Sequence, residues 1–202
     1  MKFHLGKVPE ETDFHPKEQG WKSIIEPSPF WIQLIAIPVA LATVIPLGLI
    51  FLSINRHAIM AIPFWGLITV LLFLIPIHEF AHALLHPGWG LTNNTIIAFW
   101  PAMMLFYASY RKEMSRNRFL AVFLMPLILL TGLPIPLYII LSVIGIFPEV
   151  AGILSLTAVI NAAAASGDLI GIFLILVQIP ANAVVRNQGW RTYWKLPSYR
   201  LY

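Results

Sequence analysis

The chain has 202 residues, of which 58% are hydrophobic and only 11% are charged. Soluble proteins carry about 25% charged residues, so this composition excludes an ordinary soluble domain and indicates an integral membrane protein. The net charge of +4 comes from basic residues that flank apolar segments, and it does not indicate nucleic acid as a partner. Because the chain has no cysteine, a metal site must use histidine or carboxylate ligands.

The amino-terminal part predicts a polar arm followed by a first membrane span. Residues 1–29 mix both signs of charge and lack the apolar core and cleavage site of a signal peptide. The apolar segment 30–54 is long enough to cross a bilayer, which needs about 20 helical residues. Pro38 and Pro46 predict kinks in this helix rather than its end, because neighbouring helices can satisfy the freed carbonyls.

A polar loop at residues 55–57 separates the first span from a second one at residues 64–86. The next apolar segment, residues 95–110, has only 16 residues and contains Pro101 in its middle. It follows a turn-like Asn-Asn pair and is rich in aromatic residues, which favours a strand hairpin or a re-entrant segment. A short, tilted span is the alternative.

Two further spans are predicted in the second half of the chain. Residues 119–147 form one long apolar segment, and the prolines inside it leave pieces too short to cross alone, so we expect one kinked span. A fourth span covers residues 150–167. Residues 169–179 are apolar but too few to cross a bilayer, which predicts a re-entrant or interfacial helix.

The positive charges of the chain predict how these spans are oriented. The loop at residues 111–118 holds four basic residues, and residues 181–202 form a second basic segment. Basic segments that flank spans lie on the cytoplasmic side, and two spans separate these two segments. The sequence therefore predicts a multi-pass protein of the cell membrane with both termini in the cytoplasm, in contact with the lipid bilayer.

The predicted fold class is an all-α polytopic membrane protein with about four transmembrane helices, at residues 30–54, 64–86, 119–147 and 150–167. The predicted domain organisation has three parts. Residues 1–29 form the polar arm, residues 30–180 form a membrane-embedded catalytic domain, and residues 181–202 form a basic cytoplasmic tail.

The most informative motif is the sequence His-Glu-Phe-Ala-His at residues 78–82, near the end of the second span. On a helix, residues four apart share one face, so His78 and His82 can bind one metal ion. Two imidazoles suit zinc, which in catalytic sites keeps an open position for water. Glu79 can then act as a general base on that water. A charge inside a span costs at least about 2.5 to 3.5 kcal/mol, which favours a functional role.

A catalytic zinc site needs a third protein ligand. His86 would lie about 12 Å from His78 along the helix axis, too far to share one ion with it. Among the acidic residues of the apolar region, Asp168 alone lies at the predicted depth of His78. We therefore expect Asp168 to be the third zinc ligand.

Asn161 lies seven residues before Asp168, which is two turns and nearly the same face of a continuous helix. Its amide can hydrogen-bond a substrate carbonyl or a developing oxyanion. A packing hydrogen bond between helices is the alternative role.

The motif at residues 78–82, together with the segment from Asn161 to Asp168, resembles the site-2 protease class of intramembrane zinc metalloproteases. More closely, it is similar to a group of small bacterial membrane proteins described as putative zincin peptidases. The resemblance implies zinc bound by His78, His82 and Asp168, with Glu79 as catalytic base and Asn161 as a substrate-orienting residue. It also implies that residues 95–110 form sheet elements beside the zinc site, where an extended substrate can add as a strand. The aspartate here follows a glycine, whereas in site-2 proteases it precedes one.

These observations predict a membrane zinc endopeptidase that cleaves membrane-associated proteins or peptides. The alternative is a non-proteolytic transporter or accessory protein that uses Glu79 and Asp168 as a proton or ion site. A zinc hydrolase that acts on another type of bond is a third hypothesis.

Overall fold

A computed structural model describes residues 1–197, so the last five residues of the predicted basic tail, among them Arg200, lie outside the described residues. The described chain is mostly helical, but strands from several parts of it form two small sheets. The prediction of an all-α protein is therefore correct for the helices that could cross a membrane and wrong for the two sheets. The chain divides into two compact units: the first contains residues 1–32, residues 82–124 and the chain from Asp168 onward, and the second contains residues 33–81 and 125–167.

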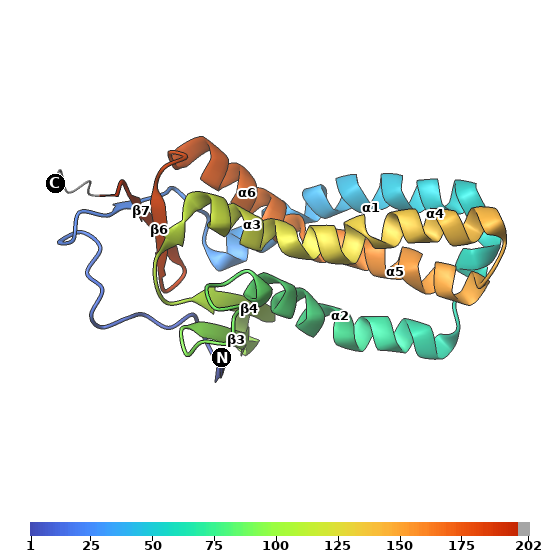
Figure 1. Cartoon of the computed structure of the whole chain (residues 1–202), viewed down its shortest axis with the longest axis horizontal. Helices are drawn as coiled ribbons and strands as arrows, with labels where there is room; N and C mark the ends of the chain where they lie inside the picture. Colours follow the sequence, from blue (N-terminus) through green and yellow to red (C-terminus); the bar gives the residue numbers. More distant parts are fainter. Residues whose placement is uncertain (198–202) are drawn as a thin grey trace. The chain divides into compact units, whose positions relative to one another are not determined.

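Three helical stretches are long and apolar enough to cross a membrane (Figure 1). They are α1 (Pro29–Met60), α2 (Phe64–Leu84) and the stretch Arg116–Ile144, which consists of α3 (Arg116–Leu127), the π-helix η2 (Ile128–Gly132) and α4 (Pro134–Ile144). Helices α5 (Pro148–Ala164) and α6 (Ser166–Gln178) are bent by 48° relative to each other and form a fourth candidate span if taken together. The predicted spans thus correspond to real helices, and the predicted short helix at residues 169–179 corresponds to α6.

Helix α1 continues through Pro38 and Pro46, as predicted, and has its one break at Asn55. The backbone of Asn55 is non-helical, with φ −155° and ψ 87°. Its side-chain oxygen accepts a hydrogen bond from the amide of Ala58 at 3.1 Å, which is the role of an N-cap residue for the helical turn that follows. The polar residues 55–57 therefore mark a kink rather than a loop between helices.

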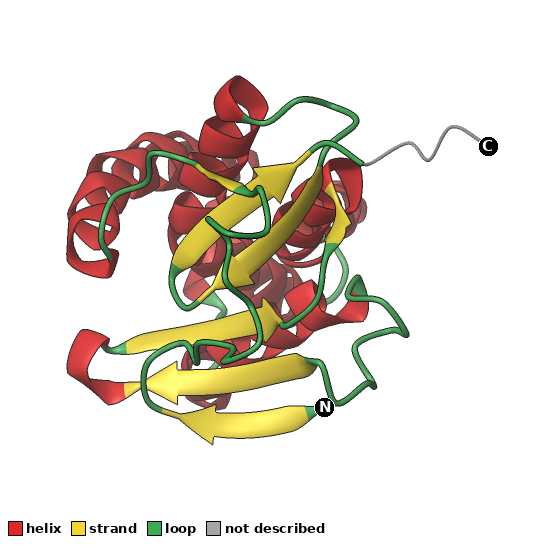
Figure 2. Cartoon of the chain, turned by 90° about the vertical axis from the view of Figure 1, so that its left-hand side faces the viewer, coloured by secondary structure: helices red, strands yellow, loops and turns green. Residues whose placement is uncertain are grey.

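Residues 95–110 form a hairpin of β3 (Thr95–Trp100) and β4 (Leu105–Tyr110), with a short 3₁₀ turn, η1 (Pro101–Met103), between them. The strand interpretation of this segment is confirmed. The first strand of the chain, β1 (Lys2–Leu5), pairs in parallel with β3, so the strand order is β1-β3-β4 (Figure 2). An arm predicted only to be polar thus contributes the edge strand of this sheet.

The second sheet joins three segments that are far apart in sequence. Its strand order is β2 (Lys22–Ser23), β7 (Arg191–Lys195), β6 (Val184–Gln188) and β5 (Met114–Ser115). One face of this sheet, with Met114 and Val185, packs against Phe119 of α3 and Ile175 of α6 to form a core of the first unit. The polar arm, the basic loop and the tail are therefore held in one sheet.

The second unit is built from α-helices that approach closely. Tyr138 of α4 is fully buried, and its hydroxyl donates to the carbonyl oxygen of Phe51 at 2.6 Å. A β-carbon added at Gly152 of α5 would lie 2.3 Å from the carbonyl oxygen of Ala58. Small residues let helix backbones approach closely, so the glycine allows α1 and α5 to pack against each other at this point.

Candidate metal centre

The histidine motif lies in the last two turns of α2, before the helix ends at Leu84. Gly90 follows in a left-handed conformation with φ 72°, and a β-carbon there would lie 2.4 Å from the carbonyl oxygen of Ala83. The chain after α2 therefore folds back against the end of the helix at a position that only glycine can occupy. This close approach lies just after the end of the helix at Leu84, two residues beyond His82.

His78, Glu79 and His82 are all buried in the structure. Each offers one ligand atom, and these three atoms lie within 4.8 Å of one another along the single helix α2. The predicted pairing of the two histidines on one helical face is therefore present. Among the described residues, this is the one group of three or more histidine, cysteine or acidic side chains with the spacing of a metal site.

Within the second unit, the imidazole of His78 is held by Asn161. The Nδ1 atom of His78 lies 2.9 Å from the side-chain oxygen of Asn161. The side-chain nitrogen of Asn161 donates to the carbonyl oxygen of Pro126 at 3.0 Å and to the hydroxyl of Thr131 at 2.9 Å. Because the nitrogen of the amide serves two acceptors, its oxygen must accept the Nδ1–H of His78. The Nε2 atom of His78 then carries a lone pair.

Within the first unit, the imidazole of His82 is held by a backbone carbonyl. The Nδ1 atom of His82 lies 2.8 Å from the carbonyl oxygen of Val122. A carbonyl oxygen can only accept, so Nδ1 carries a proton, and in the neutral ring Nε2 then carries the lone pair. Second-shell hydrogen bonds of this kind are the usual way in which proteins orient metal-binding histidines.

Asp168 also lies in the first unit, in the first turn of α6, and it faces His82. One carboxylate oxygen of Asp168 lies 3.3 Å from Nε2 of His82. A neutral imidazole with its proton on Nδ1 and a carboxylate both present electron pairs at this contact, and a shared cation or proton relieves their repulsion. This donor set of imidazole nitrogen and carboxylate oxygen fits zinc.

Asn161 and Asp168 do not lie on one continuous helix, contrary to the face argument from their spacing. The helix breaks at Ala165, whose ψ is 2°, and α6 begins at Ser166 with the bend of 48°. Asn161 is therefore near the end of α5 and contacts His78, whereas Asp168 lies in the first turn of α6 and contacts His82. Three further residues that the sequence did not single out contact this constellation: Val122, Pro126 and Thr131.

His86, which the sequence interpretation placed near the helix end and outside the ligand set, is almost completely buried. Its Nδ1 atom lies 3.3 Å from the hydroxyl of Thr95, and its ring lies 5.4 Å from the ring of Tyr110. Arg118 donates to the carbonyl oxygens of Leu85 and His86. These contacts tie the end of α2 to the hairpin and give His86 a structural role.

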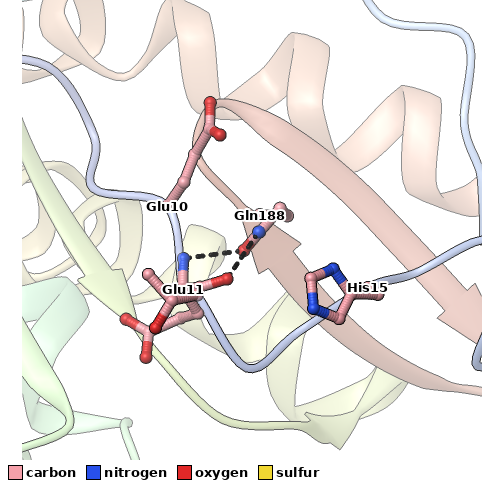
Figure 3. A pocket seen from close by; sticks show the side chains of 5 residues that line it. Glu10, Glu11, His15 and Gln188 are labelled. Atoms are coloured by element: carbon pink, nitrogen blue, oxygen red, sulfur yellow. Dashed lines mark hydrogen bonds between the residues drawn. The ribbon is translucent and has the colours of Figure 1, made fainter.

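A separate pocket of about 390 Å³ lies in the first unit, far along the chain from the histidine motif (Figure 3). It is lined by Glu10, Glu11, Thr12, His15 and Gln188. The amide of Gln188 accepts from the backbone of Glu11 and donates back to its carbonyl oxygen, at 3.0 and 2.9 Å. This pocket contains none of the predicted site residues.

The family model of the putative zincin peptidases matches residues 71–184, which is more than half of the chain and includes the whole constellation described above. The chain belongs to the putative zincin peptidase family. The same comparisons found no matching curated protein and no matching solved structure. Membership in this family supports a zinc metallopeptidase, and the group formed by His78, Glu79 and His82 fits the metal that the family implies.

Proposed function

We propose that this member of the putative zincin peptidase family is an intramembrane zinc endopeptidase that cleaves membrane-associated proteins or peptides. The observation that carries the proposal is the position of His78, Glu79 and His82 within 4.8 Å on α2, a helix apolar enough to cross a membrane. Burying a carboxylate between two imidazoles on such a helix costs free energy, and this cost favours a functional role for Glu79.

In this proposal His78, His82 and Asp168 hold the zinc ion. Zinc in such a site polarises a carbonyl group and lowers the pKa of water. The Nδ1 hydrogen bonds of His78 and His82 keep their Nε2 atoms available as ligands. Asp168 supplies the negative charge against His82. The burial of all three residues excludes bulk water from the ligands.

Glu79 is the proposed general base. Its carboxylate takes a proton from the water that attacks the peptide carbonyl, and it returns this proton to the leaving amine. Asn161 has a different role from the substrate contact predicted from sequence, since both ends of its amide are engaged by His78, Pro126 and Thr131. We assign Asn161 to the orientation of His78.

The sheet of β1, β3 and β4 is the proposed place for an extended substrate. A helical substrate must unwind before cleavage, because its carbonyls are bonded internally, and a sheet edge can hold the unwound segment as an added strand. The edge strand β1 exposes its side chains, among them Phe3 and Leu5. These apolar side chains suit a substrate taken from a membrane.

We further propose that both termini lie in the cytoplasm. The second sheet supports a common side for the polar arm, the basic loop and the tail, because β2, β5, β6 and β7 are hydrogen-bonded to one another. The positive charge of the loop and the tail favours the cytoplasmic side. A single cysteine introduced at Ser115 should be protected from an impermeant thiol reagent added outside intact cells.

Glu79→Gln tests the proposed reaction. In native membranes, the wild type should generate protein fragments that the variant does not, with a loss of at least about 100-fold in the rate of the affected cleavages. Glu149→Gln is the matched control, because Glu149 is exposed at the start of α5. Identical fragment patterns for the wild type and Glu79→Gln would exclude proteolysis by this site and favour the transporter alternative.

A further inference from the structure

A proline in α3 has a consequence for the backbone facing His82. In an α-helix the amide of residue 126 would donate to the carbonyl oxygen of residue 122, but Pro126 has no amide hydrogen. The carbonyl oxygen of Val122 therefore lacks its regular helical partner. In the structure it accepts the Nδ1–H of His82 at 2.8 Å, so the proline makes available the acceptor that orients this imidazole.

The chain after Pro126 continues as the π-helix η2 instead of a regular α-helix. The amide of Leu133 donates to the carbonyl oxygen of Ile128 at 2.9 Å, a separation of five residues. π-bulges of this kind occur often at functional sites. Thr131 lies in this π-helix, and its hydroxyl accepts from Asn161 at 2.9 Å and donates to the carbonyl oxygen of Ala158 at 3.3 Å.

The carbonyl oxygen of Pro126 completes the contacts of Asn161. It accepts from the Asn161 amide at 3.0 Å, and Thr131 accepts the second hydrogen of the same group. Asn161 is fully buried, so these two acceptors fix which way its amide points. Its oxygen is thereby directed at Nδ1 of His78, 2.9 Å away.

We propose that Pro126 and the π-helix that follows it form a positioning device for the metal ligands. The amide-free proline releases the Val122 carbonyl for His82, and the Pro126 carbonyl and Thr131 hold Asn161 against His78. Both imidazoles are thereby kept in the tautomer with the proton on Nδ1, which presents Nε2 to the metal. This inference rests on the proposed function, because it assumes that the two histidines bind zinc. The position of the proton on each ring can nevertheless be measured in the metal-free protein.

The proposal differs from a structural role for Pro126 as a simple kink. A kink would affect the direction of the helix and leave the histidine rings unchanged. The positioning role predicts that the two rings respond separately, because Pro126 reaches His82 through Val122 and reaches His78 through Asn161. Replacement of Pro126 by alanine removes only the first effect, since residue 126 keeps its carbonyl oxygen.

The test compares Pro126→Ala with Pro46→Ala, a matched change at a proline inside α1. Alanine at residue 126 supplies an amide hydrogen that competes with His82 for the Val122 carbonyl. Nitrogen-15 NMR of histidine-labelled, metal-free protein should show a proton fixed on Nδ1 of His82 in the wild type and in Pro46→Ala, whether or not Nε2 shares a proton with Asp168, and a mixture with Nε2–H forms that lack the Nδ1 proton in Pro126→Ala. The tautomer of His78 should stay the same in all three.

Zinc affinity, measured by competition with a chromophoric chelator, should fall about 10- to 100-fold in Pro126→Ala and remain unchanged in Pro46→Ala. An unchanged His82 tautomer in Pro126→Ala would overturn the positioning role, whatever the affinity. Failure of the wild type to bind zinc would overturn the proposed function instead, and the tautomer difference would still support the positioning role.

A second variant covers the case in which Pro126→Ala does not fold. Asn161→Ala removes the acceptor of His78 and leaves Val122 in place. Without this acceptor, His78 should become a mixture of Nδ1–H and Nε2–H forms, and zinc binding should weaken about 10- to 100-fold, with the His82 tautomer unchanged. A His78 ring that keeps its tautomer in Asn161→Ala would contradict the proposed device.

Discussion

The imidazole of His82 donates its Nδ1–H to the carbonyl oxygen of Val122 at 2.8 Å, and Pro126, four residues later, is the reason that this carbonyl has no regular helical partner. The Nε2 atom on the other side of the ring faces Asp168 at 3.3 Å. The His82 ring thus contacts, on one side, the carbonyl that Pro126 leaves without a helical partner and, on the other side, the carboxylate proposed as a zinc ligand.

Gly152→Ala should destabilise the second unit. A β-carbon at Gly152 would lie 2.3 Å from the carbonyl oxygen of Ala58 and 2.7 Å from a side-chain carbon of Ile62, so α1 and α5 must move apart. Overpacking of this kind costs about 1 to 3 kcal/mol. Thermal unfolding in detergent measures the loss.

Gly48→Ala is the control for that change, because an added β-carbon at Gly48 meets nothing within 4 Å. Its unfolding temperature should equal that of the wild type or exceed it slightly, since alanine favours the helix. Equal unfolding temperatures for Gly152→Ala and Gly48→Ala would contradict the close approach of the two helices.

Tyr138→Phe should also destabilise the second unit, by about 1 to 3 kcal/mol. The hydroxyl of Tyr138 donates to the carbonyl oxygens of Phe51 and Asn55, at 2.6 and 3.1 Å, next to the break in α1. Its removal leaves these carbonyls without that donor, whereas the ring volume is kept.

The control for this hydroxyl is Tyr110→Phe, since Tyr110 lies in the first unit, where its ring contacts His86, whereas the break in α1 lies in the second unit. Denaturation in detergent compares the two variants with the wild type. A larger loss of stability in Tyr110→Phe than in Tyr138→Phe would disprove the role of the Tyr138 hydroxyl at the kink.

The partly buried side chain of Glu26 should make the stability of the folded protein depend on pH. Burial raises the pKa of Glu26, and hydrogen bonds from Thr192 at 2.6 and 3.1 Å oppose this effect only in part. The folded protein therefore binds the proton more tightly than the unfolded chain does. Ionisation of Glu26 costs stability above its raised pKa, and this cost disappears as the pH falls through that pKa toward the ordinary value of 4.5.

Glu26→Gln mimics the protonated form and should remove this cost. The variant should be more stable than the wild type at pH 8, and the difference should shrink as the pH approaches 4.5. Glu18→Gln, the same change at an exposed position of the arm, is the matched control. A stability difference between Glu26→Gln and the wild type that is independent of pH would argue against a shifted pKa.

The helices and the central motif of this protein could be predicted from sequence, because both depend on local patterns. Apolar length located α1 and α2, and the four-residue spacing placed His78 and His82 on one face. The strands of the arm and the tail could not be predicted in the same way. β2 has two residues and pairs with β7, more than 160 residues later, and such pairing depends on contacts that no local pattern encodes.

The contacts of the site were also beyond local patterns. The sequence could not decide whether Asn161 contacts the substrate or makes a packing hydrogen bond, because its partners lie on other segments of the chain. Pro126 was visible as a proline in an apolar segment, but its effect on His82 depends on which carbonyl faces that ring. The sequence predicted separate segments at residues 150–167 and 169–179, but it did not locate the break at Ala165, which has no proline beside it.

Metal content tests the central claim most directly. Purified wild-type protein and Glu79→Gln should each carry about one zinc ion per chain, whereas His82→Ala and Asp168→Ala should carry almost none. His57→Ala, which changes a histidine outside the candidate site, should keep the wild-type amount. A wild type that carries no zinc and takes up none when zinc is supplied, or an Asp168→Ala variant that keeps the full amount, would contradict the proposed site.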